Sequence, residues 1–379
     1  MSQPNNYGFE EEAAMLKDSA RRFFAEKLPV DQLHALIAAD PDPERSPEVI
    51  WPEALWAEMV ELGWTALAVP ESAGGIAMPW VAVAGLLEEA GRAALPSPLL
   101  STLQVTAVLA QAGAAAAPAL GEIAEGTAAT LAFMDVSGAQ QVGAVVVEDG
   151  RLRGQANFVQ DVGKCDRLLV LAREGDGTAL FWVPCDANGI TVHRDAIVDL
   201  TRDQAHVSFD AVVGERIDCD AAQAWAAAQP VIWTLISADM VGAAEWQLQT
   251  TTEYAQQRKQ FDRPLGFFQA LKHQLVDTMI AIDESKSLVY SAACALNHEP
   301  QRARELAHMA KASASDTAGF ASGRSVQCHG GIGFTWESDV HLYLKRIQLD
   351  QVSFGDAEHH RARLGATLRQ RVGDGIPIL

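Results

Sequence analysis

The spacing of apolar residues predicts helices in the first third of the chain. In residues 9–28 apolar side chains recur every three or four positions with Glu and Lys between them, which is the period of an amphipathic helix. Residues 51–62, 81–95 and 100–109 repeat this period. Residues 69–75, V-P-E-S-A-G-G, predict a loop, because Pro and Gly interrupt regular structure.

The pattern changes after about residue 125. Short stretches of Val, Leu, Ile and Phe are separated there by Gly/Asp turns, a spacing typical of a small antiparallel β domain. The predicted strands cover residues 142–147, 151–154, 167–172, 179–183 and 205–209. Helical spacing then returns over residues 221–257, 269–296 and 302–322. We therefore predict an α+β fold with three domains, which are helical over residues 1–122, β over 123–220 and helical over 221–379.

Composition narrows the classes of partner. The 379 residues include 29 Lys+Arg and 49 Asp+Glu, a formal net charge of -20. Such acidity argues against nucleic acid and against an anionic membrane surface, because binding to either needs a basic face. It does not argue against a small anionic ligand, since a few local Arg or Lys residues can hold one.

Cysteine usage and the N-terminus predict a soluble cytoplasmic protein without a metal. The five cysteines lie far apart and form no CxxC pair, so neither a zinc site nor a disulfide scaffold is expected. The first residues lack the apolar stretch of a signal peptide, and no run of apolar residues is long enough for a membrane span.

One of two motifs with chemical content covers residues 258–273, Arg-Lys-Gln-Phe-Asp-Arg-Pro-Leu-Gly-Phe-Phe-Gln-Ala-Leu-Lys-His. The guanidinium of Arg258 and the amide of Gln260 suit a phosphate or the edge of an adenine. Phe261 and Phe268 offer flat apolar surfaces for a ring. Taken alone, the stretch also fits an ordinary corner between two helices.

The second motif covers residues 327–337, Gln-Cys-His-Gly-Gly-Ile-Gly-Phe-Thr-Trp-Glu. Three glycines within four positions let a backbone approach a ligand closely, and their N–H groups can meet a pyrophosphate. No βαβ unit surrounds the motif, so it is not a Rossmann fingerprint. By itself it is more often a glycine-rich turn between helices.

Together the two motifs resemble the acyl-CoA dehydrogenase family. In that family a motif R-x-Q-F-G-x-P-[IL]-x-x-F-Q-x-x-x-H lies at a helix corner. A second motif, Q-x-x-G-G-x-G-[FY], follows it, and the distance between the two motifs is similar to that in this chain. This chain has both in that order, with Asp262 where Gly is usual. Residues 69–75 and Glu88-Glu89 also look like the family's N-terminal domain. The resemblance implies an N-terminal helical domain, a middle antiparallel β domain and a C-terminal four-helix bundle.

The resemblance also implies a function and a cofactor. Family members are FAD flavoproteins, usually tetramers, that oxidise the Cα–Cβ bond of an acyl-CoA. A carboxylate removes the α-proton while a hydride leaves Cβ for the flavin, and electron-transfer flavoprotein is the usual electron acceptor. By direct match, FAD would contact, across a subunit interface, Arg258, Gln260, Phe261, Leu265, Phe268, Gln269, Gln327, Gly330 and Gly331.

The catalytic positions depart from the family. Its Glu in the segment Y-E-G-T falls on Phe354, and its other location for the base falls on Ile232, with Trp233 where Arg is common. None of these side chains can act as the base. Two nearby carboxylates are candidate substitutes: Asp239 shares a helix face with Ile232, and Asp356 lies two residues beyond Phe354. Each also fits a solvated or salt-bridged aspartate.

The part of the β zone that would face a flavin departs as well. Residues 131–138 stand where the family has T-E-P-x-A-G-S-D, and residues 158–161 where it has W-[IV]-[TS]-N. The motifs that would contact a neighbouring subunit's FAD are kept, while the motifs that would surround the flavin ring in the chain's own pocket are missing. We therefore predict one subunit of a heteromeric dehydrogenase, paired with a homologous subunit, for a bulky substrate such as a steroid side-chain acyl-CoA.

Two alternatives stay open. The chain could be a self-sufficient homotetramer that uses Asp239 or Asp356 as base, or a flavin-free scaffold that keeps only the fold. For some other polar residues we expect a structural role and no part in catalysis or metal binding. The adjacent His359 and His360 are expected at the surface, and Asp350 on a charged helix face.

Overall fold

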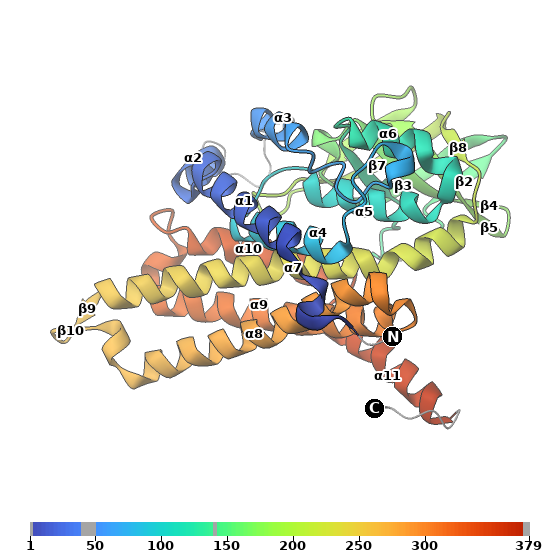
Figure 1. The fold of residues 1–379 in the computed structure, drawn as a ribbon. Coiled ribbons are helices and arrows are strands. Elements are labelled where there is room, and N and C mark those ends of the chain that lie inside the picture. The colour runs from blue at the N-terminus through green and yellow to red at the C-terminus, as the bar shows by residue number, and fades with distance from the viewer. Residues whose placement is uncertain (1–2, 39–50, 139–141, 374–379) are drawn as a thin grey trace. The chain divides into compact units, whose positions relative to one another are not determined.

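The computed structural model describes residues 3–38, 51–138 and 142–373, and its internal contacts divide the chain into two compact units (Figure 1). The helical unit comprises Met1–Ala38, Trp80–Leu95 and Trp233–Leu379, and the sheet unit comprises Ala39–Pro79 and Pro96–Ile232. The predicted fold class, with helices, then strands, then a helical bundle, is confirmed.

The helical unit is built from long helices joined by tight connections. Their bounds are α1 Glu11–Lys27, α2 Val30–Ala38, α4 Trp80–Arg92, α7 Ala221–Gln257, α8 Gln269–His298, α9 Pro300–His329, α10 Val340–Val352 and α11 Ala357–Gly373. The shorter elements are 3-10 turns at Asn5–Gly8, Leu265–Phe267 and Gly330–Phe334, and a hairpin of β9 Lys259–Gln260 and β10 Arg263–Pro264. The long helix predicted through Pro230 is confirmed as α7, whose residues up to 232 belong to the sheet unit.

Two glycines let α4 and α7 cross at backbone contact. A Cβ atom on Gly242 would lie 1.8 Å from the carbonyl oxygen of Glu88, and one on Gly91 would lie 2.0 Å from that of Asp239. Both distances are far shorter than a van der Waals contact, so only glycine fits at either position. The crossing therefore places the backbone at Asp239 directly against α4.

A buried ion cluster ties α1 and α8 to α4 beside this crossing. The carboxylate of Glu88 is buried, accepts a hydrogen bond from Tyr290 (2.7 Å), and pairs with Lys17 (2.6 Å) and Lys286 (2.7 Å). Burial raises the pKa of Glu88, but the two lysines outweigh it and lower that pKa to about 2. The Glu88-Glu89 pair noted in the sequence thus lies in an internal salt-bridge network of this chain.

The sheet unit contains one sheet with short helices around it. Its strands are β1 Ala129–Ala132, β2 Val145–Glu148, β3 Arg151–Gln160, β4 Arg167–Glu174, β5 Gly177–Pro184, β6 Ile190–Arg194, β7 Gln204–Val212 and β8 Glu215–Ile217. Its helices are α3 Glu53–Glu61, α5 Leu99–Gln111 and α6 Ala117–Ala124, with 3-10 turns at Glu71–Ala73, Gly113–Ala116 and Val162–Lys164. The strand order is β6-β7-β3-β2-β4-β5-β8, and β1 lies beside β4.

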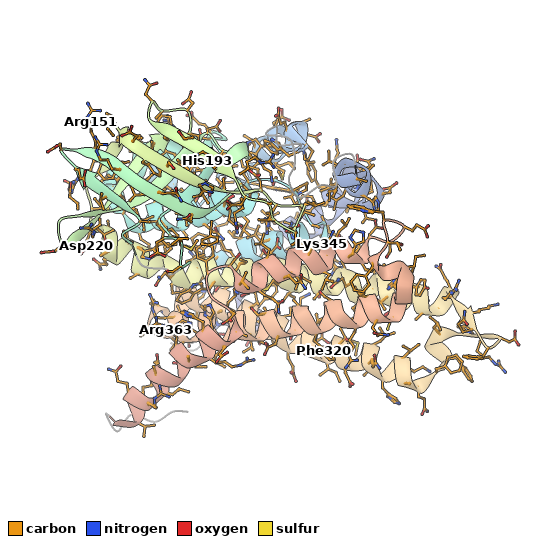
Figure 2. The ribbon with its side chains drawn as sticks, turned by 180° about the vertical axis from the view of Figure 1, so that it is seen from behind. Arg151, His193, Asp220, Phe320, Lys345 and Arg363 are labelled. Carbon is orange, nitrogen blue, oxygen red and sulfur yellow. The ribbon has the colours of Figure 1, made fainter. Side chains whose placement is uncertain are left out.

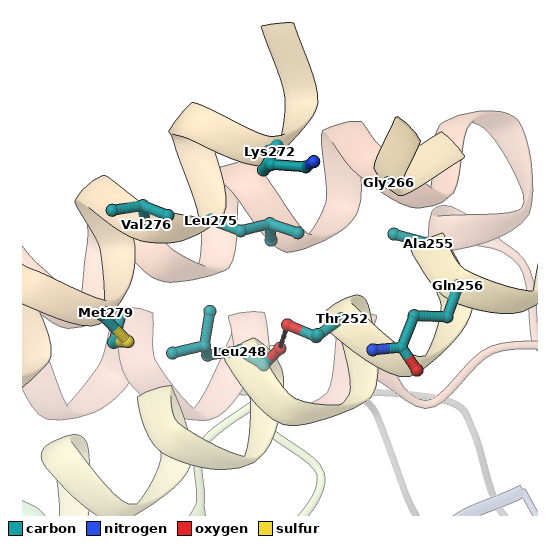
Figure 3. A pocket seen from close by; sticks show the side chains of 9 residues that line it. All are labelled: Leu248, Thr252, Ala255, Gln256, Gly266, Lys272, Leu275, Val276 and Met279. Carbon is teal, nitrogen blue, oxygen red and sulfur yellow. Dashed lines mark hydrogen bonds between the residues drawn. The ribbon is translucent and has the colours of Figure 1, made fainter. Parts of the chain in front are cut away.

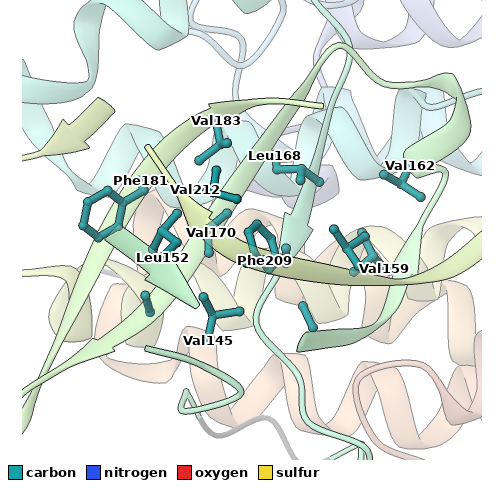
Figure 4. Close-up of a cluster of buried hydrophobic side chains, with 14 of the residues drawn as sticks. Val145, Leu152, Val159, Val162, Leu168, Val170, Phe181, Val183, Phe209 and Val212 are labelled. Atoms are coloured by element: carbon teal, nitrogen blue, oxygen red, sulfur yellow. The ribbon is translucent and has the colours of Figure 1, made fainter. Parts of the chain in front are cut away.

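The prediction of an antiparallel sheet was wrong in one respect. Strand β4 pairs in parallel with both β1 and β2, while the other ladders of this sheet are antiparallel. Strand β1 follows α6 and is not joined to β4 by a hairpin, so its direction is not constrained to be antiparallel. Alternate residues of β4, Leu168 and Val170, point into the hydrophobic core with Phe181 and Phe209 (Figure 4).

Most of the predicted helices and strands form in the structure, and some short elements were not predicted. The helices expected over residues 9–28, 51–62, 81–95 and 100–109 form as α1, α3, α4 and α5. Strands β1, β6 and β8 were missed, because runs of three to five residues show little alternation. Helices α2 and α6 were also missed, although α3, which has the same length as α2, was predicted. Within the described ranges, no helix is long and apolar enough to cross a membrane. Among the same residues, no His, Cys, Asp and Glu side chains are grouped as ligands for a metal ion.

Candidate functional site

The Arg258 motif forms an exposed hairpin between α7 and α8. Gln260 pairs with Arg263 across β9 and β10, so Phe261 and Asp262 form a two-residue turn. Both turn residues have left-handed backbones, with φ of 51° and 59°. That conformation is unfavourable for phenylalanine, and the Phe261 side chain is 87% exposed. Left-handed backbones at both positions are usual for a two-residue hairpin turn, and this turn leaves the ring of Phe261 exposed to solvent.

The polar side chains of this hairpin are available to a ligand. Arg258, Gln260 and Gln269 are exposed, and none of their side chains has a hydrogen-bond or ion-pair partner among the described residues. Leu265 and Phe268 are half-buried beside them. The motif therefore presents a guanidinium and two amides that can donate hydrogen bonds to a phosphate or a base edge.

The glycine-rich motif begins where α9 ends. Gly330 has φ 65° and ψ -145°, a backbone region that is essentially restricted to glycine. Gln327 is exposed on the last turn of α9. A Cβ atom on Gly330 or Gly331 would meet no atom within 4 Å. The space beside Gly331 is therefore open to a molecule from outside this chain.

Contacts between α7 and α9 bring the two motifs to the same end of the helical unit. The rings of Tyr254 and His329 stack with their centroids 4.2 Å apart, and the hydroxyls of Thr251 and Ser325 lie 2.7 Å apart. Tyr254 and Thr251 lie within seven positions of Arg258, and His329 and Ser325 lie within five positions of Gly330. The sequence placed the motifs 69 residues apart (327 minus 258), and the packing of α7 on α9 brings them together.

An apolar groove of about 310 Å³ adjoins the hairpin between α7 and α8 (Figure 3). Its lining consists of Leu248, Thr252, Ala255, Gln256, Gly266, Lys272, Leu275, Val276 and Met279. The Thr252 hydroxyl donates to the carbonyl of Leu248 (2.7 Å), so that polar group is already satisfied within α7. The groove thus adds apolar surface next to the polar hairpin.

Position 354 lies in the connection between α10 and α11, inside a cluster of aromatic rings. Phe354 is buried with φ 56°, and its carbonyl accepts a hydrogen bond from Nε2 of His360 (3.0 Å). Nδ1 of His360 lies 2.8 Å from Nδ1 of His308, and the His308 ring stacks on Trp233 at 4.4 Å between centroids. Residue 354 is therefore enclosed by packed side chains of this chain.

The expectation that His360 lies at the surface was wrong. The side chain is fully buried, because α11 packs this position against α9. Burial, followed by the charge of Lys311 and the neighbouring His308, lowers the pKa of His360 to about 3. Burial, followed by Arg304 and then by groups on α11 that include Arg363 (Figure 2), lowers the pKa of His308 to about 4. Both rings are therefore neutral near pH 7.

Asp350 was also predicted wrongly. It is fully buried on α10, and its negative charge acts on Lys311 of α9. The cluster around position 354 left no signal in the sequence, because its members come from α7, α9 and α11 and each sits in an unremarkable helical pattern. Only the packing of these helices reveals it.

Asp239 forms a buried ion pair with Arg346. Its side chain is 1% exposed, and Arg346 donates Nε to one carboxylate oxygen (2.9 Å) and Nη2 to the other (2.6 Å). Arg346 also donates to the carbonyl of Leu95 (3.3 Å). The salt-bridged interpretation of Asp239 fits this geometry, and a base role would require the pair to break.

Asp356 lies at the start of α11 and is exposed. One carboxylate oxygen accepts the backbone N–H of His359 (2.8 Å), which is the geometry of a helix N-cap. The capping bond explains an aspartate at this position without catalysis. The exposed carboxylate still keeps Asp356 as a candidate base.

In the sheet unit, the segment of residues 158–161 turns its carboxylate inwards. Asp161 is buried with φ 53°, pairs with Lys164 (2.7 Å) and accepts a hydrogen bond from Ser101 (3.1 Å). Phe158 lies at an irregularity of β3 with φ 56° and is partly exposed. One aromatic ring thus remains available at this strand, while the charged group serves the unit's own packing.

Comparisons with known proteins agree over both ends of the chain. The family described as acyl-CoA dehydrogenase, N-terminal domain, matches residues 10–126, and acyl-CoA dehydrogenase, C-terminal domain, matches residues 234–368. The acyl-CoA dehydrogenase IpdE2 of Mycobacterium tuberculosis is 32% identical over 337 residues, which cover 89% of this chain and 91% of that protein.

Solved structures are similar over nearly the full length. A variant of the Tcur3481-Tcur3483 steroid ACAD superposes with a TM-score of 0.84 at 29% identity, covering 96% of this chain and 99% of that chain. The ChsE4-ChsE5 complex from Mycobacterium tuberculosis also has a TM-score of 0.84, at 24% identity and with the same coverage, and it supports the fold alone.

Proposed function

This chain belongs to the acyl-CoA dehydrogenase family of oxidoreductases acting on CH–CH bonds, and on that premise we propose that it is one subunit of a heteromeric, FAD-dependent dehydrogenase. Its substrate is a bulky acyl-CoA, such as a steroid side-chain thioester. A homologous subunit is its partner, and electron-transfer flavoprotein is the acceptor by family resemblance.

The observation that carries the proposal is a contrast between the base positions and the cofactor-binding motifs. One base position holds Phe354, which is buried against His360 and cannot take a proton. At the other base position is Ile232, an apolar side chain. By contrast, the Arg258 hairpin and the Gly331 loop are exposed and open. A chain that keeps cofactor-binding groups without a base is suited to a site whose base comes from a homologous subunit.

The exposed groups fit FAD. Arg258 offers a charged donor for its diphosphate, and the open backbone at Gly330 and Gly331 lets the phosphates approach closely. Phe261 and Phe268 offer apolar faces beside a ring. Bound FAD supplies the acceptor for the hydride that leaves Cβ of the substrate. The role proposed for this chain is to hold the cofactor and to exclude water from it.

The relatives support a paired assembly and a bulky substrate. The structure at 29% identity is a steroid acyl-CoA dehydrogenase named for two proteins, Tcur3481 and Tcur3483. We carry both properties to this chain as part of the proposal.

Flavin retention should depend on a partner. We expect the chain purified alone to be colourless, and to acquire the visible absorbance of oxidised flavin when it is co-expressed with a homologous subunit that carries the family Glu. A yellow chain without a partner would instead favour the self-sufficient homotetramer. If neither preparation binds FAD, the flavin-free scaffold is the correct description.

Arg258→Ala should weaken FAD binding by about 1.5–3 kcal/mol, which is roughly 10- to 100-fold in Kd, because a charged hydrogen bond to the cofactor is lost. Titration of the apo-assembly with FAD measures the change. Arg369→Ala is the matched control, since Arg369 is also exposed but lies on α11. Equal FAD affinity in the two variants would show that the hairpin does not hold the cofactor.

A further inference from the structure

Lys311 of α9 is fully buried and plays no part in the proposed function. Its Nζ donates to the carbonyl oxygens of Gly355 (2.9 Å) and Gln351 (3.0 Å) and to the hydroxyl of Ser315 (3.2 Å). Gln351 is near the end of α10, and Gly355 lies in the connection from α10 to α11. One side chain of α9 therefore holds both ends of residues 351–355.

The His308–His360 pair holds the middle of the same segment. A carbonyl oxygen only accepts, so Nε2 of His360, which lies 3.0 Å from the carbonyl of Phe354, must carry a hydrogen. Nδ1 of the neutral His360 ring then accepts, and His308 donates to it through its own Nδ1 (2.8 Å). Protonation of both rings would set two Nδ1–H groups against each other and break the pair.

The segment needs this support because its backbone is strained. Phe354 has φ 56°, an unfavourable value for a bulky side chain, and Gly355 follows with φ 96°. Three carbonyls of residues 351–355 are bound by Lys311 and His360. These contacts oppose the relaxation of Phe354 to an ordinary conformation.

We propose that Lys311, His308 and His360 form a proton-sensitive latch on residues 351–355: opening of the segment takes up protons at these side chains, so the latch tightens as the pH rises. The physical reason is burial. The three acceptors of Lys311 are neutral oxygens, so its ammonium form is better solvated by water than in the closed latch. The latch concerns this chain's own conformation and does not depend on the proposed function.

The pH dependence of opening follows from the lowered pKa of each side chain. Burial lowers the pKa of Lys311 from 10.5 to about 7 in the closed latch. A lysine exposed by opening regains its ordinary pKa, so opening takes up one proton between these values and is suppressed as the pH rises from 7 to 10.5. The histidines behave in the same way at lower pH, since burial lowers the pKa of His308 to about 4 and of His360 to about 3.

Charged groups on α9, on α10 and at or in α11 face the latch. Those on α10 and at the start of α11 that raise the pKa of Lys311 are Asp350 and Asp356. Those that lower the pKa of one or both histidines are Arg304, Lys311, His359 and Arg363. Helix α8 contributes a hydroxyl, Ser285, which bonds to Ser313 and Thr317 of α9 and does not titrate in this range. Burial has the largest effect on the pKa of Lys311, of His308 and of His360, and these charged groups have smaller effects.

Hydrogen exchange of the full chain tests the latch. The probes are the amides of Ser353 and Gly355, which donate to the carbonyls of Leu349 (3.1 Å) and Val352 (3.2 Å). After correction for the intrinsic pH dependence of exchange, we expect their protection to rise by up to about tenfold per pH unit between about pH 7.5 and 9.5, because one proton is released on closing. Protection that does not change over this range would overturn the proposal without any variant.

The variant Lys311→Met tests whether Lys311 causes the rise in protection with pH. It keeps the length and removes the titratable group, so the rise in protection should disappear. Lys272→Met is the matched control, because Lys272 is exposed on α8 and should leave the rise unchanged. An equal slope in Lys311→Met and in the unaltered chain would reject Lys311 as the source of the proton.

Discussion

Asp239→Ala is expected to lower the free energy of unfolding by about 3–5 kcal/mol, because it leaves the buried guanidinium of Arg346 without its counter-charge. Urea unfolding followed by circular dichroism measures the change. The double variant Asp239→Leu/Arg346→Met should lose less than Asp239→Ala alone, since it leaves no unpaired charge in the interior. Asp277→Ala is a control for a carboxylate exposed on α8 and should change stability by no more than about 0.5 kcal/mol.

The same variants separate a structural from a catalytic role. If Asp239 were the base, Asp239→Asn would abolish dehydrogenation while the free energy of unfolding stayed near that of the unaltered chain. The bidentate geometry leads us to expect the opposite, which is a less stable assembly that keeps activity where it still folds. Asp356→Asn completes the test, because activity in both variants would remove the self-sufficient mechanism.

Gly242→Ala is expected to destabilise the chain by roughly 3 kcal/mol, although alanine is ordinarily the better helix former. The new methyl group would lie 1.8 Å from the carbonyl oxygen of Glu88 and 2.9 Å from the backbone nitrogen of Arg92, so α4 and α7 would have to separate. Thermal or denaturant unfolding of the purified chain measures the loss.

Gly323→Ala is the matched control for this prediction. Gly323 lies in the interior of α9, and a Cβ atom there would meet nothing within 4 Å. Alanine at this position should raise stability by about 0.5–1 kcal/mol through helix propensity. Similar effects of the two substitutions would contradict the close crossing of α4 and α7.

Contiguous features were predictable from the sequence. The Arg258 hairpin and the Gly330 loop are short motifs whose residues act together because they are adjacent in the chain, so their residue types and order identified the family. That apolar residues stand at positions 232 and 354 was readable for the same reason. The long helices α7, α8 and α9 were predicted because a period of about 3.6 residues becomes unmistakable over many turns.

Contacts between distant residues were not predictable. Asp239 follows Ile232 at helical spacing, and nothing local shows that Arg346, far along the chain on α10, occupies both of its oxygens. His360 belongs to a polar helix, so its pattern indicated the surface, while α9 covers it and His308 bonds to it. In each case burial depends on which helix lies opposite, and that information is absent from the local pattern.

The sequence by itself determined the family and the succession of a helical part, a β part and a second helical part, because these depend on local period and on adjacent residue types. The tertiary structure decided the environment of each ionisable group. It placed Asp239 in a salt bridge, enclosed the ring of His360 and surrounded Lys311 with carbonyls. The physical reason is that desolvation and pairing are properties of packed surfaces, which arise only when α4, α7, α9, α10 and α11 come together.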